Sequence, residues 1–135
     1  MFRFIFQIWR CYKKIKKLGK STQLGKKDIS SAFRLLPLYP GDFCLPGLTL
    51  LWKEYINKCL PMGCWISCAL FEKNTTFLQW ALQKKSCLNT VDHYFDDFIF
   101  LGRPGTDECS LLVKEYDNLW ASLGVPLTVK EKKDQ

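Results

Sequence analysis

Two adjacent acids, Asp96 and Asp97, interrupt an otherwise apolar stretch of the chain, HYFDDFIFLG at residues 93–102. Aspartate is depleted in β-strands, and neighbouring carboxylates repel each other unless positive charge lies close to them. A pair of acids in a hairpin is often only a polar turn. Turn acids usually stand beside Gly, Asn or Ser, whereas this pair is flanked on both sides by aromatic and β-branched residues. The pair is therefore a candidate for chemistry.

A third carboxylate, Asp28, ends a short strand that the sequence predicts over residues 24–29. If this strand neighbours the hairpin, three carboxylates meet at one edge of a sheet. Magnesium prefers oxygen ligands, and it typically takes one or two carboxylates together with substrate phosphates. Two such ions about 4 Å apart stabilise the attacking and leaving oxygens of an in-line phosphoryl displacement. The three acids therefore suggest a two-metal site.

Alternating strand and helix patterns surround these acids. Strands are expected at 48–52 and 54–58, as a hairpin at 91–95 and 98–102, and at 125–129. A helix is expected over 65–84, with Ile66, Leu70, Phe77 and Ala81 on its apolar face. A second helix should begin at 106–108 and end at Gly124, with a stripe formed by Leu112, Tyr116, Leu119, Trp120 and Leu123. This order predicts an α+β domain whose antiparallel sheet is covered on one face.

The chain is basic, with a formal net charge of +7 over 135 residues, and 47% of it is hydrophobic. Such a composition indicates a folded domain, and its charge favours a polyanionic partner, although charge that serves only solubility is the alternative. Lysines cluster within residues 13–27 of an N-terminal segment that is expected to be irregular. A solvated face and a phosphate-tracking surface both account for that cluster.

The seven cysteines are an odd number, and neither a secretory signal nor an apolar run of about 20 residues is visible. Free, mostly buried thiols in a reducing compartment are therefore expected, which places the chain inside the cell, in the cytoplasm or nucleus. Cys59, Cys64 and Cys68 with His93 could be imagined as a zinc site, but their spacing matches none of the usual zinc patterns.

Four segments occur in the order and rough spacing of a reverse transcriptase palm. They are KDISSAFRLLPLYP (27–40), LPMGCWISCALFE (60–72), HYFDDFIFLG (93–102) and LGVPL (123–127). The resemblance covers roughly residues 15–130 and looks closest to retrotransposons of the DIRS type, which carry a tyrosine recombinase. It implies a ferredoxin-like, split βαβ palm, truncated, with an antiparallel sheet covered on one face by two helices. The implied domains are a basic, irregular remnant at 1–23, the palm at 24–130 and a charged tail at 131–135.

The resemblance also implies roles for the acids and for the segment that follows Asp28. Asp28 resembles the first metal-binding carboxylate, Asp96 the carboxylate that bridges two magnesium ions, and Asp97 its less essential neighbour; manganese could replace magnesium. The backbone near the metals and the incoming triphosphate would be that of Ile29, Ser31 and Ala32.

Further positions match motifs that surround the nucleotide. Phe33 falls where the family has an aromatic steric gate against the 2′-hydroxyl, with an ordinary core aromatic as the alternative. Met62 and Gly63 match the segment near nucleotide and template, although many relatives have Gln where Met62 stands. Lys130 or Lys132 is a weak match to the lysine that protonates pyrophosphate, and an exposed tail lysine is the other interpretation.

The implied function is RNA-directed DNA polymerisation. Its partners would be an RNA template, a DNA primer and deoxynucleoside triphosphates, without a membrane. The fingers, thumb and ribonuclease H regions that accompany such palms are expected to be missing from the chain. Two alternatives stay open: a catalytically inactive, transposon-derived remnant that binds nucleic acid, and a chain that does not accumulate as a stable protein.

Overall fold

The computed structural model describes residues 2–125, with side chains from Ile5 onward, and the chain forms two compact units. One unit, which we call the sheet unit, contains the residues up to Ser30 together with those from Thr75 onward. The other, the hairpin unit, is Ser31–Asn74. Helix α2 (Trp65–Ser86) contributes residues to both.

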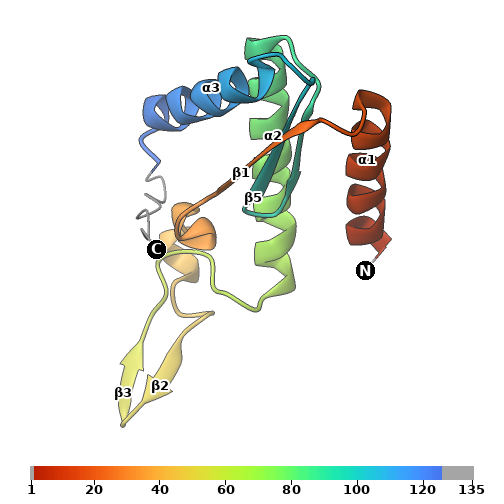
Figure 1. The fold of residues 1–135 in the computed structure, drawn as a ribbon. Helices are drawn as coiled ribbons and strands as arrows, with labels where there is room; N and C mark the ends of the chain where they lie inside the picture. The colour runs from red at the N-terminus through yellow and green to blue at the C-terminus, as the bar shows by residue number, and fades with distance from the viewer. Residues whose placement is uncertain (1, 126–135) are drawn as a thin grey trace, which may run out of the picture. The chain divides into compact units, whose positions relative to one another are not determined.

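A three-stranded antiparallel sheet forms the centre of the sheet unit, in the order β1-β5-β4 (Figure 1). Strand β1 covers Gln23–Asp28, β4 covers Val91–Tyr94 and β5 covers Asp97–Gly102. The expected strand at 24–29 and the expected hairpin are therefore present, and they pair with each other.

Two residues, Phe95 and Asp96, connect β4 to β5. Phe95 has φ 51°, in the left-handed region that two-residue hairpin turns often require and that bulky side chains rarely adopt. The backbone of the turn is held from outside the hairpin, because Ile29 N–H donates to the Asp96 carbonyl at 3.0 Å.

The core lies between one face of the sheet and helix α3 (Glu108–Ser122). Phe98 and Phe100 of β5 are buried, and their rings lie 5.2 Å and 5.3 Å from that of Tyr116. Trp120 packs edge-on to Phe98 at 6.3 Å. These aromatic contacts bury large apolar surfaces, which makes them the main source of stability on this face.

Helix α2 shares that face of the sheet with α3 (Figure 1), and its Lys85 forms an ion pair with Glu115 of α3 at 3.2 Å. On β4, His93 stacks on Phe98 and its ring contacts the side-chain amide of Gln79 on α2. The α+β class, with an antiparallel sheet covered on one face by two helices, is confirmed.

The prediction of which face of α2 is buried is wrong. Ile66, Leu70 and Phe77 are 50%, 45% and 57% exposed. The buried positions lie one residue further along the helix, and they are Ser67, Phe71, Thr75, Leu78 and Leu82. Two of these five are small polar residues, so the true stripe has a weaker hydrophobic signal than its exposed neighbour.

The N-terminal segment also differs from expectation, because residues 2–18 are not irregular. They form helix α1 (Phe2–Leu18), which ends before Gly19 at φ 101°. The helix packs against β4 and β5, and Lys14 donates to the Val91 carbonyl at 3.0 Å and pairs with Asp92 at 3.5 Å. This helix was not expected because the segment was interpreted as a cluster of lysines, although apolar residues lie between the charges at helical spacing.

Helix α3 agrees with expectation at both ends. It begins at Glu108, one residue after Asp107, and Gly124 follows it at φ 69°. Its buried stripe consists of Cys109, Leu112, Tyr116 and Trp120, whereas Leu123 is 53% exposed. The strand expected at 125–129 lies outside the described residues from 126 onward.

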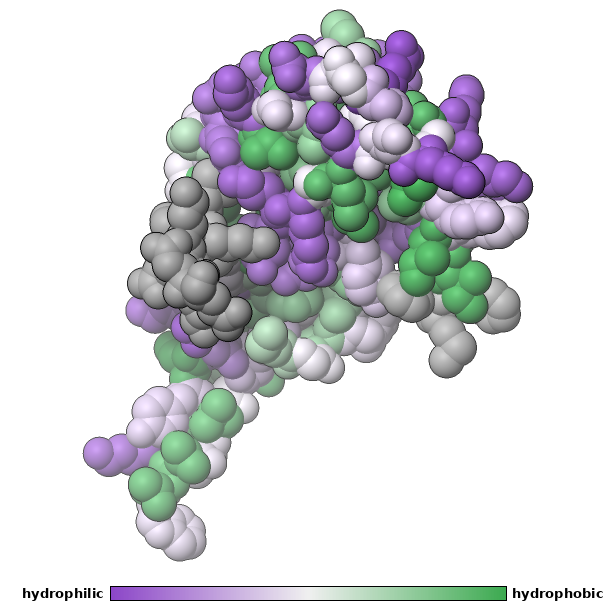
Figure 2. Space-filling model, in the orientation of Figure 1, coloured by the Kyte–Doolittle hydropathy of each residue, from purple (hydrophilic) through white to green (hydrophobic). Residues whose placement is uncertain are grey.

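The hairpin unit contains the second predicted strand pair, β2 (Leu48–Leu50) and β3 (Lys53–Tyr55), each shorter than expected. Two short 3-10 helices precede it, Ala32–Leu35 and Pro40–Asp42. The hairpin has an exposed hydrophobic surface (Figure 2), and its tip residues Leu51 and Trp52 are 84% and 99% exposed. Both have positive φ, 50° and 63°, as a tight turn requires.

The cysteines are free thiols, but the expectation that most are buried is wrong, because only Cys109 is. Within residues 2–125, no helix is long and apolar enough to cross a membrane.

Candidate metal and nucleotide site

Asp28 and Asp97 are direct partners in the pairing of β1 with β5. Asp96 lies in the adjoining turn, and its carbonyl accepts the hydrogen bond from Ile29, the residue after Asp28. The convergence expected from the sequence is therefore present in the backbone: the three acids lie at one end of the sheet, on two neighbouring strands and the turn between β4 and β5.

The side chains of Asp28 and Asp97 share one face of the sheet, because directly opposed residues of an antiparallel pair point the same way. It is the face opposite α3. Lys27, the residue before Asp28, points to the other face, where it pairs with Asp117 of α3 at 3.1 Å.

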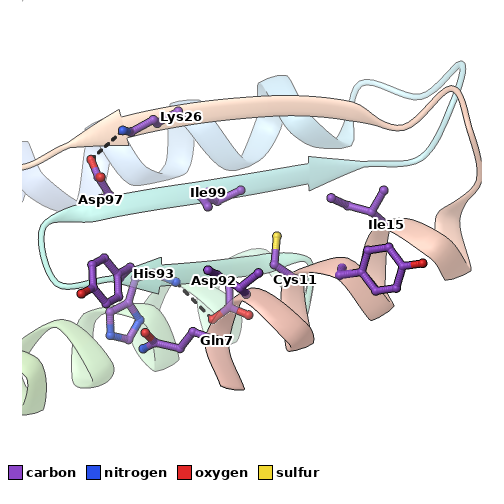
Figure 3. Close-up of a pocket in the computed structure, with 11 residues that line it drawn as sticks. Gln7, Cys11, Ile15, Lys26, Asp92, His93, Asp97 and Ile99 are labelled. Atoms are coloured by element: carbon purple, nitrogen blue, oxygen red, sulfur yellow. Dashed lines mark hydrogen bonds and ion pairs between the residues drawn. The ribbon is translucent and has the colours of Figure 1, made fainter. Parts of the chain in front are cut away.

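Lys26 lies on the same face as the acids, since it precedes Asp28 by two residues in β1. Its ammonium group is 3.0 Å from Oδ1 of Asp97 (Figure 3). The hydrogen bond and the charge of Asp97 raise the pKa of Lys26, and the charges of Asp28 and Asp96 raise it further. All three acids therefore act on one lysine, which supplies the positive charge that the acidic pair requires.

The acids also affect the core on the opposite face. Burial raises the pKa of the Tyr116 phenol, and the negative charges of Asp117 and Asp28 raise it further.

The described residues contain no group of three or more His, Cys, Asp or Glu side chains that could hold a metal ion. This applies both to the acids and to the cysteines considered for zinc. Magnesium bound with substrate phosphates needs only one or two protein carboxylates. Asp28 opposite Asp97 provides oxygen donors of that number and type, so the donor set suits a hard divalent ion that a nucleotide helps to ligate.

The remaining candidate residues divide between the two units. Ile29 is buried in the sheet unit beside the turn that carries Asp96. The hairpin unit contains Ser31, Ala32, Phe33, Met62 and Gly63.

Within the hairpin unit these residues have distinct surroundings. Ser31 has φ 55° and is exposed, whereas Ala32 is buried. Phe33 is half-buried, and its ring lies 5.1 Å from that of the fully buried Phe71. Met62 is 86% exposed, and Gly63 has φ 82°. Lys130 and Lys132 lie outside the described residues.

Sequence reasoning missed a cavity beside the acids, because it expected no helix at the N-terminus. Between α1 and the acid-bearing face of the sheet lies a cavity of about 420 Å³ (Figure 3). Lys26 and Asp97 contribute to its lining, together with Ile8, Tyr12 and Ile15 of α1. The missed role of Lys26 had a signal in the sequence, namely its spacing of two residues from Asp28 in a predicted strand.

Several solved structures share this fold. The prototype foamy virus protease-reverse transcriptase superposes with a TM-score of 0.67 at 22% identity, over 82% of this chain and 14% of that one. A foamy viral protease-reverse transcriptase in complex with double-stranded DNA gives 0.66 at 19% identity, over 81% and 18%. The same viral enzyme in complex with an RNA/DNA hybrid gives 0.61 at 24% identity, over 82% and 14%.

The fold is therefore reverse-transcriptase-like. At these identities the similarity concerns the fold, and the chain spans between 14% and 18% of the length of these neighbours. No protein family model matches the sequence, and no curated protein matches it.

Proposed function

We propose that the chain is the palm, over residues 24–130, of a retrotransposon reverse transcriptase of the DIRS type. The observation that supports the proposal most directly is the pairing of Asp28 with Asp97 beside the turn that carries Asp96, in a reverse-transcriptase-like fold. The chemistry would be RNA-directed DNA synthesis inside the cell.

In the proposed reaction, the primer 3′-hydroxyl attacks the α-phosphorus of a deoxynucleoside triphosphate. A new oxygen–phosphorus bond forms, the bond to the bridging oxygen breaks, and pyrophosphate leaves. Two magnesium or manganese ions, when bound, would neutralise charge on the attacking and leaving oxygens. Asp28 and Asp96 would hold both ions, and Asp97 would assist them.

The protein's own contribution is to fix these carboxylates before substrate arrives. Pairing of β1 with β5 fixes the backbone of Asp28 and Asp97, and the Ile29–Asp96 hydrogen bond fixes the turn. Acids whose backbone is already held in place need less reorganisation during the reaction.

The resemblance implies roles for the remaining candidate residues in binding the nucleotide. We assign the backbone at Ser31 and Ala32, with that of Ile29, to the triphosphate, and the ring of Phe33 to the sugar. Met62 and Gly63 would lie near base and template, since the absence of a side chain at Gly63 permits close backbone approach. Lys130 or Lys132 would protonate pyrophosphate. The RNA template and DNA primer would be partners, as would fingers, thumb and ribonuclease H regions.

Nucleotide binding and primer extension test this function. With magnesium, the wild-type chain should bind a deoxynucleoside triphosphate and extend a DNA primer on an RNA template. Asp96→Asn and Asp28→Asn should each reduce metal-dependent binding or extension at least about 100-fold. Asp107→Asn is the matched control, because it neutralises an exposed acid beside α3. Unchanged activity in Asp96→Asn would contradict the proposal.

A second candidate function, nucleic-acid binding without catalysis, is favoured by the net charge of +7. Its affinity for RNA or DNA should fall steeply with salt, because binding to phosphates releases counter-ions. Salt-dependent binding of nucleic acid with no magnesium-dependent nucleotide binding would select this function.

A further inference from the structure

We propose that Lys26 is an internal counter-ion of the acidic pair, Asp96 and Asp97, and that a divalent cation displaces the lysine when it binds. The inference rests on the proposed metal site and adds a residue that controls how strongly the site holds metal. Lys26 acts through the carboxylates, so it is a positioning residue and not a catalytic one.

The placement of Lys26 supports this role. Its ammonium group lies 3.0 Å from Oδ1 of Asp97, the residue directly opposite Asp28. Like charges on directly opposed residues destabilise a strand pair. Lys26 relieves that repulsion in the metal-free protein, as a bound cation also would.

The ion pair between Lys26 and Asp97 is also exposed enough for the lysine to be exchanged for a cation. The side chains of Lys26 and Asp97 are 55% and 37% exposed, so the ammonium group can leave for solvent without disturbing the core. A lysine is a point charge on a flexible stem, and it lacks the fork of donors with which arginine holds a carboxylate bidentately. The strand fixes the lysine backbone, while the charged group stays free to move.

Competition follows from this geometry. A divalent ion held by Asp28 and Asp96 would compete with Lys26 for the assisting carboxylate of Asp97, so part of the ion's interaction with the carboxylates is offset by the weakened ion pair. Lys26 should therefore stabilise the metal-free strand pair and weaken metal binding, so that binding is strongest when substrate phosphates supply further ligands.

Lys27 provides a matched control. It is the adjacent residue and has the same charge, but it pairs with Asp117 on the other face of the sheet at 3.1 Å. Lys26→Gln and Lys27→Gln therefore change the net charge equally, and each removes one ion pair. Only Lys26→Gln removes the positive charge that lies beside the acidic pair.

The test is titration with Mn²⁺, followed by the electron paramagnetic resonance signal of free Mn²⁺, without nucleotide. Lys26→Gln should bind Mn²⁺ about three- to tenfold more tightly than wild type, whereas Lys27→Gln should stay within about twofold of it. Lys26→Arg keeps the charge and can hold the carboxylate bidentately, so it should bind Mn²⁺ no more tightly than wild type. Added Mn²⁺ should also raise the melting temperature of Lys26→Gln more than that of Lys27→Gln.

The outcomes separate this inference from the proposed function. Equal Mn²⁺ affinity in Lys26→Gln and Lys27→Gln, or weaker binding in Lys26→Gln, overturns the counter-ion role. Weaker nucleotide binding with unchanged Mn²⁺ affinity overturns it too, because Lys26 would then contact the triphosphate. If Asp28→Asn and Asp97→Asn both bind Mn²⁺ as wild type does, the metal site itself fails.

Discussion

Gly102 at the end of β5 lies directly against Cys109 in the first turn of α3. A Cβ at Gly102 would fall 2.8 Å from the backbone nitrogen of Cys109 and 2.8 Å from its Cβ. Strand β5 carries Asp97 at its other end. This contact therefore anchors the strand that positions one of the acids.

Gly102→Ala should destabilise the protein by about 1–3 kcal/mol, because the new methyl group meets helix backbone that cannot rotate away. Urea unfolding followed by circular dichroism measures the change. Gly25→Ala is the control: its Cβ would meet the Cys109 sulfur at 3.1 Å, a side-chain atom, so its cost should be smaller. Equal stability of Gly102→Ala and wild type would show that α3 does not pack this closely on β5.

The buried face of α2 provides a second prediction. Leu78 is 4% exposed and its neighbour Phe77 is 57% exposed. Leu78→Ala should cost about 2–5 kcal/mol of unfolding free energy because it leaves a cavity. Phe77→Ala should cost less than about 1 kcal/mol. If Phe77→Ala loses more unfolding free energy than Leu78→Ala, the face expected from the sequence is the buried one.

The difference between expectation and structure at α2 has a physical cause. Apolar residues lie on two faces of the helix, one with Ile66, Leu70 and Phe77 and the other with Phe71, Leu78 and Leu82. Periodicity alone favoured the first face, which has more hydrophobic members. Burial instead follows the face that carries Ser67 and Thr75. Tertiary packing here buries the less hydrophobic of two helical faces, and a sequence window does not contain that information.

The acid-bearing end of the sheet was more predictable. Asp28 ends a strand and the acidic pair divides a hairpin, and both features depend on local alternation that the sequence displays. The pairing of β1 with β5 could only be assumed from the sequence, since register between distant strands depends on the whole fold. Helix α1 was missed because its lysines were weighed as a run of charge rather than at helical spacing.

Phe33 provides a prediction that separates a structural from a selective role. Its ring packs on Phe71 at 5.1 Å, so Phe33→Val should lower the unfolding free energy by about 1–3 kcal/mol. If the ring also contacts the sugar, the variant should accept ribonucleotides at least about tenfold better relative to deoxyribonucleotides. The ratio of the two incorporation efficiencies measures selectivity independently of stability. An unchanged ratio in a folded, active variant would leave Phe33 as a core aromatic only.

Tyr116 should make stability fall at alkaline pH. Its pKa in the folded protein is raised above the ordinary value of 10.0 by burial, with smaller contributions from Asp117 and Asp28. The folded state therefore retains the phenolic proton where the unfolded chain releases it. Stabilisation by this group is fully present below about pH 10 and declines as pH rises from there towards the folded-state pKa.

Tyr116→Phe keeps the ring in contact with Phe98 and Phe100 and removes the titrating group. Urea unfolding between pH 8 and pH 11, which are about 2 pH units below and 1 above an ordinary tyrosine pKa, should show a shallower alkaline decline for the variant. Tyr12→Phe is a control for the loss of a tyrosine hydroxyl elsewhere in the chain, because Tyr12 of α1 is 52% exposed. Parallel pH profiles for Tyr116→Phe and wild type would contradict the raised pKa, because a buried phenol that resists ionisation must steepen the alkaline decline of the wild-type protein.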